Sequence, residues 1–154
     1  MIRTTQCYLT RDGRWLMLYR NKKENDYNHG KWIGVGGKQE PGETSEQCIM
    51  REIREETGLH AETVKLRGIV EFEYPGLEDE EIRVYTCTEF SGELTECDEG
   101  TLEWIPEERI LDLSLWEGDR VFLEKLLHND PKIFRMRLKY DTDDRLKEVI
   151  TLEA

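Results

Sequence analysis

The sequence lacks the features that direct a chain to a membrane, to secretion or to a nucleic acid polymer. No window offers the roughly 18 consecutive apolar residues of a membrane span, and Met1–Cys7 lacks the long apolar stretch of a signal peptide. Lys and Arg number 22 against 34 Asp and Glu, so the formal net charge is −12. Such a surface repels phosphate backbones, whereas non-specific DNA or RNA binding needs a positive one. We therefore expect a cytoplasmic monomer or homodimer that binds neither membranes nor nucleic acid polymers.

Cysteines are also few. Cys7, Cys48, Cys87 and Cys97 form no CxxC pair and show no zinc-finger spacing, so we expect four reduced thiols. Bulky apolar residues are not lacking: four Trp, six Tyr and four Phe are spread along the chain. A length of 154 residues fits a single domain, residues 1–154, with one core. Because the chain is so acidic, an anionic ligand would need local cations to bring it in, and a metal ion is the obvious candidate.

Apolar alternation and turn residues predict a mixture of strands and helices. Strands are expected at 2–10, 14–20, 62–75, 81–90 and 102–105, and a second helix at 117–128. A C-terminal hairpin is expected from 134–140 and 146–152 around a turn at 141–144. The segment 32–37 is apolar but rich in glycine, which suits a bend or a close backbone approach to a ligand. This pattern predicts an α/β sandwich with a mixed sheet.

The first helix is expected to run from Ser45 to Thr57 and has clear end signals. Thr44 and Gln47 have the spacing of a capping box at its start. Gly58 is well placed to end it in the left-handed conformation.

This helix carries Glu52, Glu55 and Glu56 on one face, at i, i+3 and i+4. Like charges at this spacing oppose helix formation by roughly 0.2–0.5 kcal/mol per pair. A hard divalent cation would offset that cost. Mg²⁺ prefers oxygen ligands, and besides carboxylates it usually binds several waters and the phosphates of a substrate. The alternative is a solvated acidic face, which arises easily in a chain this acidic.

Gly37 to Leu59 matches a longer pattern. From Gly37, five residues lead to Glu43 and seven more lead to Arg51-Glu52-Ile53-Arg54-Glu55-Glu56-Thr57-Gly58-Leu59. This segment, 37–59, resembles the Nudix box of the Nudix hydrolases at every defining position. The resemblance implies an α/β/α sandwich with a mixed central sheet, and an enzyme that uses Mg²⁺ or Mn²⁺ to cleave a diphosphate linkage.

The resemblance also assigns roles to the residues of the box. Glu52, Glu55 and Glu56 match the catalytic positions that bind metal and handle the attacking water. The carbonyl of Gly36 and the carboxylate of Glu99 match further metal ligands. Glu43 and Arg51 match an ion pair that braces the loop against the helix, and Gly37 and Gly58 match structural glycines.

Segments outside the box, 30–38 and 115–119, resemble the MutT/MutX branch of this family, whose members remove oxidised purine triphosphates such as 8-oxo-dGTP. The positions that match substrate contacts are Lys23, Tyr27, Ile33, Phe72, Trp116 and Asp119. Among these, Trp116 matches an aromatic that packs on the base, and Asp119 an acid that bonds to a purine edge. Two departures concern the base: Ile33 stands where an Asn reads the base, and Gly118 replaces one of two adjacent aspartates.

The expected activity is hydrolysis of a purine nucleoside triphosphate to the monophosphate and pyrophosphate. One alternative is another nucleoside diphosphate derivative, such as ADP-ribose, a dinucleoside polyphosphate or an RNA 5′ end. Another is a non-catalytic module that senses a nucleotide. Three of these positions also have a purely structural interpretation. Trp116 could be a core residue, and Glu99 and Lys23 could be solvated charges on loops.

Overall fold

Strand β1 (Ile2–Arg11) is an interior strand of the sheet in this computed structural model, which describes residues 1–152. It pairs in parallel with β6 (Glu80–Ser91) and antiparallel with β4 (Val35–Lys38), and a turn joins it to β2 (Arg14–Tyr19). The strand order is β3-β2-β1-β6-β5-β8-β9, and β7 pairs with β2. Both parallel and antiparallel pairs occur, so the predicted mixed sheet is confirmed. The remaining strands are β3 (Trp32–Ile33), β5 (His60–Glu73), β7 (Thr101–Pro106), β8 (Phe134–Tyr140) and β9 (Leu146–Thr151).

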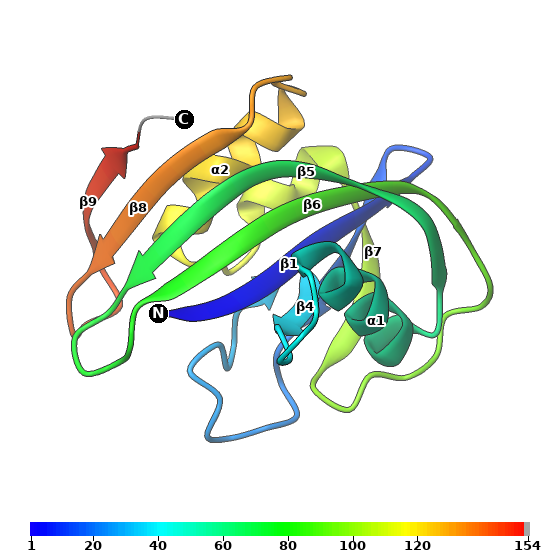
Figure 1. The fold of residues 1–154 in the computed structure, drawn as a ribbon, viewed down its shortest axis with the longest axis horizontal. Coiled ribbons are helices and arrows are strands. Elements are labelled where there is room, and N and C mark those ends of the chain that lie inside the picture. Colours follow the sequence, from blue (N-terminus) through cyan, green and yellow to red (C-terminus); the bar gives the residue numbers. More distant parts are fainter. Residues whose placement is uncertain (153–154) are drawn as a thin grey trace.

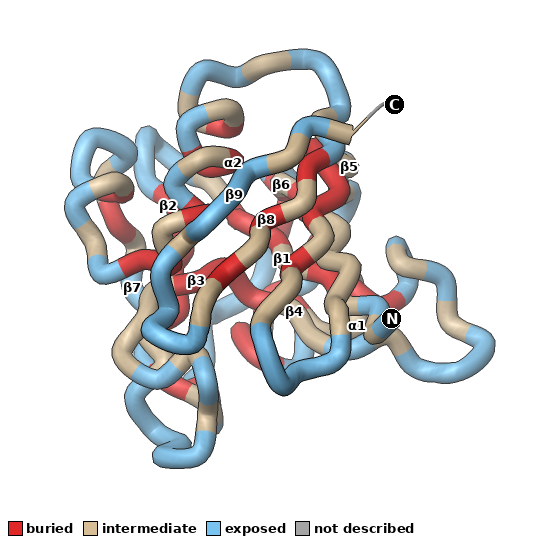
Figure 2. Tube along the Cα trace, turned by 90° about the vertical axis from the view of Figure 1, so that its left-hand side faces the viewer, coloured by how far each residue is buried: buried red, intermediate tan, exposed pale blue. Residues whose placement is uncertain are grey.

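Helices cover both faces of this sheet, α1 (Ser45–Thr57) on one and α2 (Glu117–Leu127) on the other (Figure 1). Successive side chains of a strand point to opposite faces. Along β1, Tyr8 therefore packs on the α2 side, while Cys7 and Leu9 pack on the α1 side. The single core expected from the chain length is thus divided in two by the sheet. Buried residues are concentrated in the strands and helices, and exposed residues in the loops around them (Figure 2).

Most predicted elements are confirmed, within two residues at their ends. The C-terminal hairpin forms β8 and β9, and all four cysteines are buried and free. The 3₁₀ helix η1 (Glu107–Asp112) was not predicted. The glycine-rich segment contains β3 and β4, separated by Gly34. Within residues 1–152, no helix combines the length and apolar character of a membrane span.

The ends of α1 follow the predicted signals. The Thr44 side chain accepts a hydrogen bond from the Gln47 amide at 3.1 Å, and the Gln47 side chain accepts one from the Thr44 amide at 2.9 Å. Gly58 ends the helix with a φ of 78°. Because both ends are defined, the glutamates between them have a fixed register relative to the sheet.

Thr44→Ala removes the side-chain acceptor of this capping box, so we expect it to reduce the free energy of unfolding by about 1 kcal/mol. Chemical denaturation monitored by circular dichroism measures the change. Thr44→Ser keeps the acceptor and serves as the control. Equal stabilities for Thr44→Ala and the wild-type protein would show that the cap contributes nothing.

Candidate active site

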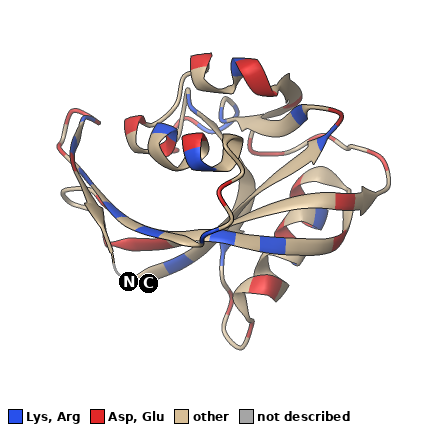
Figure 3. Ribbon diagram, turned by 90° about the horizontal axis from the view of Figure 1, so that it is seen from above, with Lys and Arg blue, Asp and Glu red and all other residues tan. Residues whose placement is uncertain are grey.

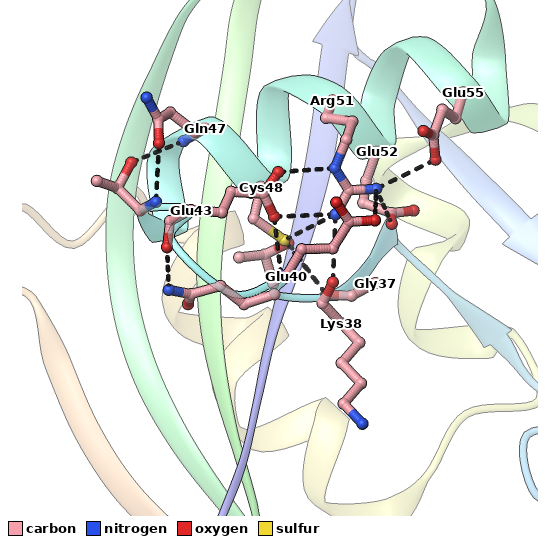
Figure 4. Close-up of polar contacts among 12 residues, drawn as sticks. Gly37, Lys38, Glu40, Glu43, Gln47, Cys48, Arg51, Glu52 and Glu55 are labelled. Atoms are coloured by element: carbon pink, nitrogen blue, oxygen red, sulfur yellow. Dashed lines mark hydrogen bonds and ion pairs between the residues drawn. The ribbon is translucent and has the colours of Figure 1, made fainter.

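Arg51 connects the loop that precedes α1 to the acidic face of the helix (Figure 4). Its Nε and Nη2 donate to the two oxygens of Glu43 at 2.7 and 3.0 Å. Its Nη1 donates to Glu52 at 2.8 Å and to Glu55 at 3.2 Å. Hydrogen bonding from Arg51 lowers the pKa of Glu43 to about 2. This network of charge-assisted bonds holds the loop and the helix in one arrangement.

The Glu52 carboxylate lies directly against the backbone of Gly37. A Cβ atom at residue 37 would come within 2.6 Å of the Glu52 carboxyl carbon, so any larger residue there would displace this carboxylate. Burial is the main cause that raises the pKa of Glu52. In the glycine-rich segment, β4 therefore closely approaches this carboxylate, whereas the approach expected from the sequence was to a ligand.

Glu56 is the most deeply buried carboxylate of the helix, with only 7% of its surface exposed. Its Oε1 accepts a hydrogen bond from the Gly36 amide at 2.8 Å. Its Oε2 has no hydrogen-bond partner. Within residues 1–152, it is the one buried side-chain nitrogen or oxygen in that situation. Burial raises the pKa of Glu56 to about 8, and the nearby Glu99 and Glu52 add to the effect.

Glu99 reaches the same region from the loop before β7, where two cations neutralise it. Arg20 lies 3.0 Å from one of its oxygens and Lys23 lies 3.4 Å from the other. Glu55 behaves differently, because its side chain is 58% exposed and touches only Arg51 among the described cations. Glu52 and Glu99 therefore line one cavity, whereas Glu56 contacts its wall through the Gly36 amide and Glu55 lies outside the wall.

The cations around the site keep these carboxylates apart. Arg51 draws Glu52 and Glu55 to one side, and Arg20 and Lys23 hold Glu99 on the other. Among the described residues, no three His, Cys, Asp or Glu side chains converge as closely as metal ligands do. Elsewhere acidic and basic residues are interspersed (Figure 3), and Arg137 pairs with Glu71, Glu73 and Asp79.

Glu56 differs from these paired carboxylates. A buried oxygen without a partner costs free energy, and hard oxygen donors are the ligands that Mg²⁺ selects. The unpaired oxygen of Glu56 therefore has the donor chemistry that suits a divalent cation, and binding would require the neighbouring carboxylates to move toward it.

A cavity of about 310 Å³ extends from this acidic end to an aromatic end. At the acidic end its walls include Glu52, Gly36, Arg20 and Glu99. At the other end they include Tyr27, Ile33, Phe72, Trp116 and Asp119. The volume lies at the lower limit of the roughly 300–1,000 Å³ typical of small-molecule sites.

The aromatic end is ordered by its own contacts. Trp116 is only 4% exposed, and its indole Nε1 donates to Asn28 at 2.7 Å. The rings of Phe72 and Trp116 meet edge to face, with centroids 5.6 Å apart. Trp116 is thus a core residue and a cavity wall at once. Asp119 is buried beside it, and burial, with a smaller effect of Glu80, raises its pKa to about 7.

Several lining residues had no signal in the sequence. Arg20 binds both Asp26, at 2.5 Å, and Glu99, and it faces the cavity from the end of β2. Glu80 accepts hydrogen bonds from Thr4 at 2.7 Å and from Tyr27 at 3.0 Å. The parallel pairing of β1 with β6 brings Thr4 beside Glu80, and no local sequence pattern predicts that pairing. Lys23 is exposed on the loop, and among the predicted substrate residues it lies outside the cavity wall.

Comparisons with known proteins show which family the chain resembles. The NUDIX domain family model matches residues 2–126. An oxidized purine nucleoside triphosphate hydrolase of Danio rerio is 32% identical over 127 residues, which cover 82% of this chain and 80% of that protein. A CTP pyrophosphohydrolase of Escherichia coli is 28% identical, covering 82% and 92%. A mutator MutT protein from Bacillus halodurans has a similar structure, with a TM-score of 0.88 and 26% identity over 98% of this chain and 97% of that one.

The buried charge of Glu56 predicts how stability depends on pH without metal. Because the pKa of Glu56 is raised in the folded state, folding favours the protonated acid. The resulting contribution to the free energy of unfolding is complete below pH 4.5 and is lost as pH rises through 8. We expect Glu56→Gln, in the metal-free state at pH 8, to be more stable than the wild-type protein by about 2 kcal/mol. Mg²⁺ should raise the unfolding temperature of the wild-type protein and leave that of Glu56→Gln unchanged.

Glu55→Gln is the matched control, because Glu55 lies on the same helix and is exposed. Thermal unfolding from pH 5 to pH 8, with EDTA and with Mg²⁺, measures all three proteins. If the wild-type protein and Glu56→Gln have the same pH profile in EDTA, Glu56 is not a buried, uncompensated acid.

Proposed function

The chain belongs to the Nudix hydrolase family, and we propose that it is a Mg²⁺- or Mn²⁺-dependent nucleoside triphosphate pyrophosphohydrolase. The proposed substrates are oxidised purine deoxynucleotides such as 8-oxo-dGTP, and the products are the monophosphate and pyrophosphate. We propose further that it acts on free nucleotides in the cytoplasm, as a monomer or a homodimer.

One observation carries this proposal: a single cavity has carboxylates at one end and aromatic walls at the other. A nucleoside triphosphate has the matching division, with its charge in the phosphates and its flat apolar surface in the base. Aromatic side chains offer faces on which a base stacks. The net charge of −12 repels free phosphates, so a cation at the carboxylate end is needed for the phosphates to bind there.

We assign the metal to Glu52, Glu55, Glu56, Glu99 and the Gly36 carbonyl. A bound divalent cation neutralises phosphate oxygens and lowers the pKa of a bound water. The protein's own residues hold the ligands in place: Arg51 orients Glu52, and the Gly36 amide orients Glu56. A carboxylate of α1 accepts the proton of the attacking water. Lys23, on the exposed loop, meets the phosphates.

At the other end, Asp119 is the group suited to read a base edge. A carboxyl with a pKa of about 7 changes its hydrogen bonding near neutral pH, because the protonated form donates and the ionised form only accepts. Guanine-type bases present N–H donors on their pairing edge, which an ionised carboxylate accepts. Ile33 contributes an apolar wall and no hydrogen bond.

Two of the relatives have names that specify a triphosphate but different bases. The Danio rerio protein is named for oxidized purine triphosphates, and the Escherichia coli protein for CTP. Hydrolysis of CTP is therefore the second candidate. Both proteins match about four-fifths of this chain, so the base preference must come from individual residues of the aromatic end.

A substrate panel with Mg²⁺ tests the proposal. We expect kcat/KM for 8-oxo-dGTP to exceed that for CTP, ADP-ribose and dinucleoside polyphosphates by about tenfold or more. Release of pyrophosphate, rather than phosphate, identifies the bond that is cut, and EDTA should abolish the reaction. Preferred hydrolysis of CTP would overturn the purine assignment, and preferred hydrolysis of ADP-ribose would overturn the triphosphate assignment; either result leaves the family intact.

Asp119→Asn tests the reading of the base. A good bidentate contact to a base is worth about 1–3 kcal/mol, so we expect kcat/KM for guanine-type substrates to fall about 5- to 100-fold, mainly through KM. In the wild-type protein, KM should decrease as pH rises through about 7 and Asp119 ionises, and this dependence should be absent in Asp119→Asn.

Glu124→Gln, an exposed position on the same helix, removes the same charge without touching the cavity. It should leave KM and its pH profile unchanged. If Asp119→Asn also leaves them unchanged, Asp119 does not contact the base.

A further inference from the structure

A second cavity of about 310 Å³ adjoins the aromatic end of the first one. Its walls include Tyr27, Tyr74, Pro75, Leu77, Trp116 and Asp144. Tyr27 and Trp116 line both cavities, so the two share a wall at the end away from the carboxylates of α1. The other walls come from the loop between β5 and β6 and from the β8–β9 turn, which lie side by side (Figure 1) and are joined by hydrogen bonds from the Tyr74 hydroxyl.

The polar atoms of the aromatic side chains in this cavity are already hydrogen-bonded within the protein. The Tyr27 hydroxyl donates to Glu80 at 3.0 Å, the Trp116 indole donates to Asn28 at 2.7 Å, and the Tyr74 hydroxyl donates to Asp144 at 2.5 Å. What remains for a ligand is mainly ring surface and the side chains of Pro75 and Leu77, with the Asp144 carboxylate as the one charged group of the wall. A wall of this kind selects apolar groups, because a polar group placed there would lose its hydrogen bonds to water.

Two of these side chains are unusually exposed for their type, Tyr27 at 51% and Leu77 at 47%. Single exposed apolar residues are common, but two on the same cavity, next to a proposed ligand site, form a patch of the kind that marks a binding surface. Asp141, Asp143 and Asp144 lie together in the β8–β9 turn beside it. This negative edge disfavours a phosphate, so an occupant must be uncharged or cationic.

We propose that this second cavity is a subsite for an apolar substituent on the base of the bound nucleotide. The ligand class is a purine nucleotide with an alkyl or aryl group on its exocyclic amine. This inference rests on the proposed function, which places the base between Phe72, Trp116 and Asp119. The exocyclic amine of guanine belongs to the edge that Asp119 is proposed to read, so a group attached to it extends past Trp116. An apolar cavity of roughly 150 Å³ is enough for a benzene ring, so the volume admits a benzyl group.

The experiment compares two probes, dGMP and N2-benzyl-dGMP, by isothermal titration calorimetry in the presence of Mg²⁺. We expect the benzyl group to tighten binding to the wild-type protein about tenfold. Leu77→Ala should remove about three- to tenfold of the affinity for N2-benzyl-dGMP and change that for dGMP less than twofold. Leu94→Ala is the matched control, because Leu94 is similarly exposed and lies outside both cavities.

Equal or weaker binding of the benzylated probe to the wild-type protein would overturn the subsite. A Leu77→Ala effect of the same size on both probes would do so as well. Hydrolysis of 8-oxo-dGTP, measured on the same preparations, reports on the proposed function separately. A benzyl effect without hydrolysis would support the subsite and contradict the proposed activity.

Discussion

The contact between the Glu56 carboxylate and the Gly36 amide is the interaction on which the rest of the site depends. It joins α1 to β4 and fixes a buried carboxylate beside Gly36, which lines the cavity, with one oxygen bonded at 2.8 Å and the other unpaired. Such an arrangement is costly in a protein without a cation. The structure can hold it because Arg51 and the capped ends of α1 fix the helix independently.

The two ends of the main cavity are governed by different physics. At the carboxylate end, ion pairs determine the positions of the side chains: Arg51, Arg20 and Lys23 pair with the glutamates and hold them apart. A cation that enters must compete with these side chains, so binding should rearrange them. At the aromatic end, cavity shape and hydrogen bonding determine which base binds. Among the described residues that line this end, Asp119 is the one carboxyl whose pKa is raised to about 7. The diphosphate chemistry and the base preference can therefore vary separately.

Local patterns in the sequence were enough to predict α1, its capping box and the C-terminal hairpin, because neighbouring residues determine each of them. The motif from Gly37 to Leu59 likewise located Glu52 and Glu56. Arg20 and Glu80 could not be predicted, since their contacts with Glu99 and Tyr27 join residues more than fifty positions apart. The second cavity depends on two loops that only the folded sheet brings together.

Binding of Mg²⁺ to the wild-type protein at pH 7, measured by calorimetry in two buffers of different ionisation enthalpy, tests the central claim most directly. Metal ligands must be deprotonated to bind. Because Glu56 has a pKa of about 8, most of it is protonated at pH 7 in the metal-free protein. The account predicts release of about 0.5–1 proton per Mg²⁺ bound. Mg²⁺ binding without proton release, or no binding at all, would contradict it.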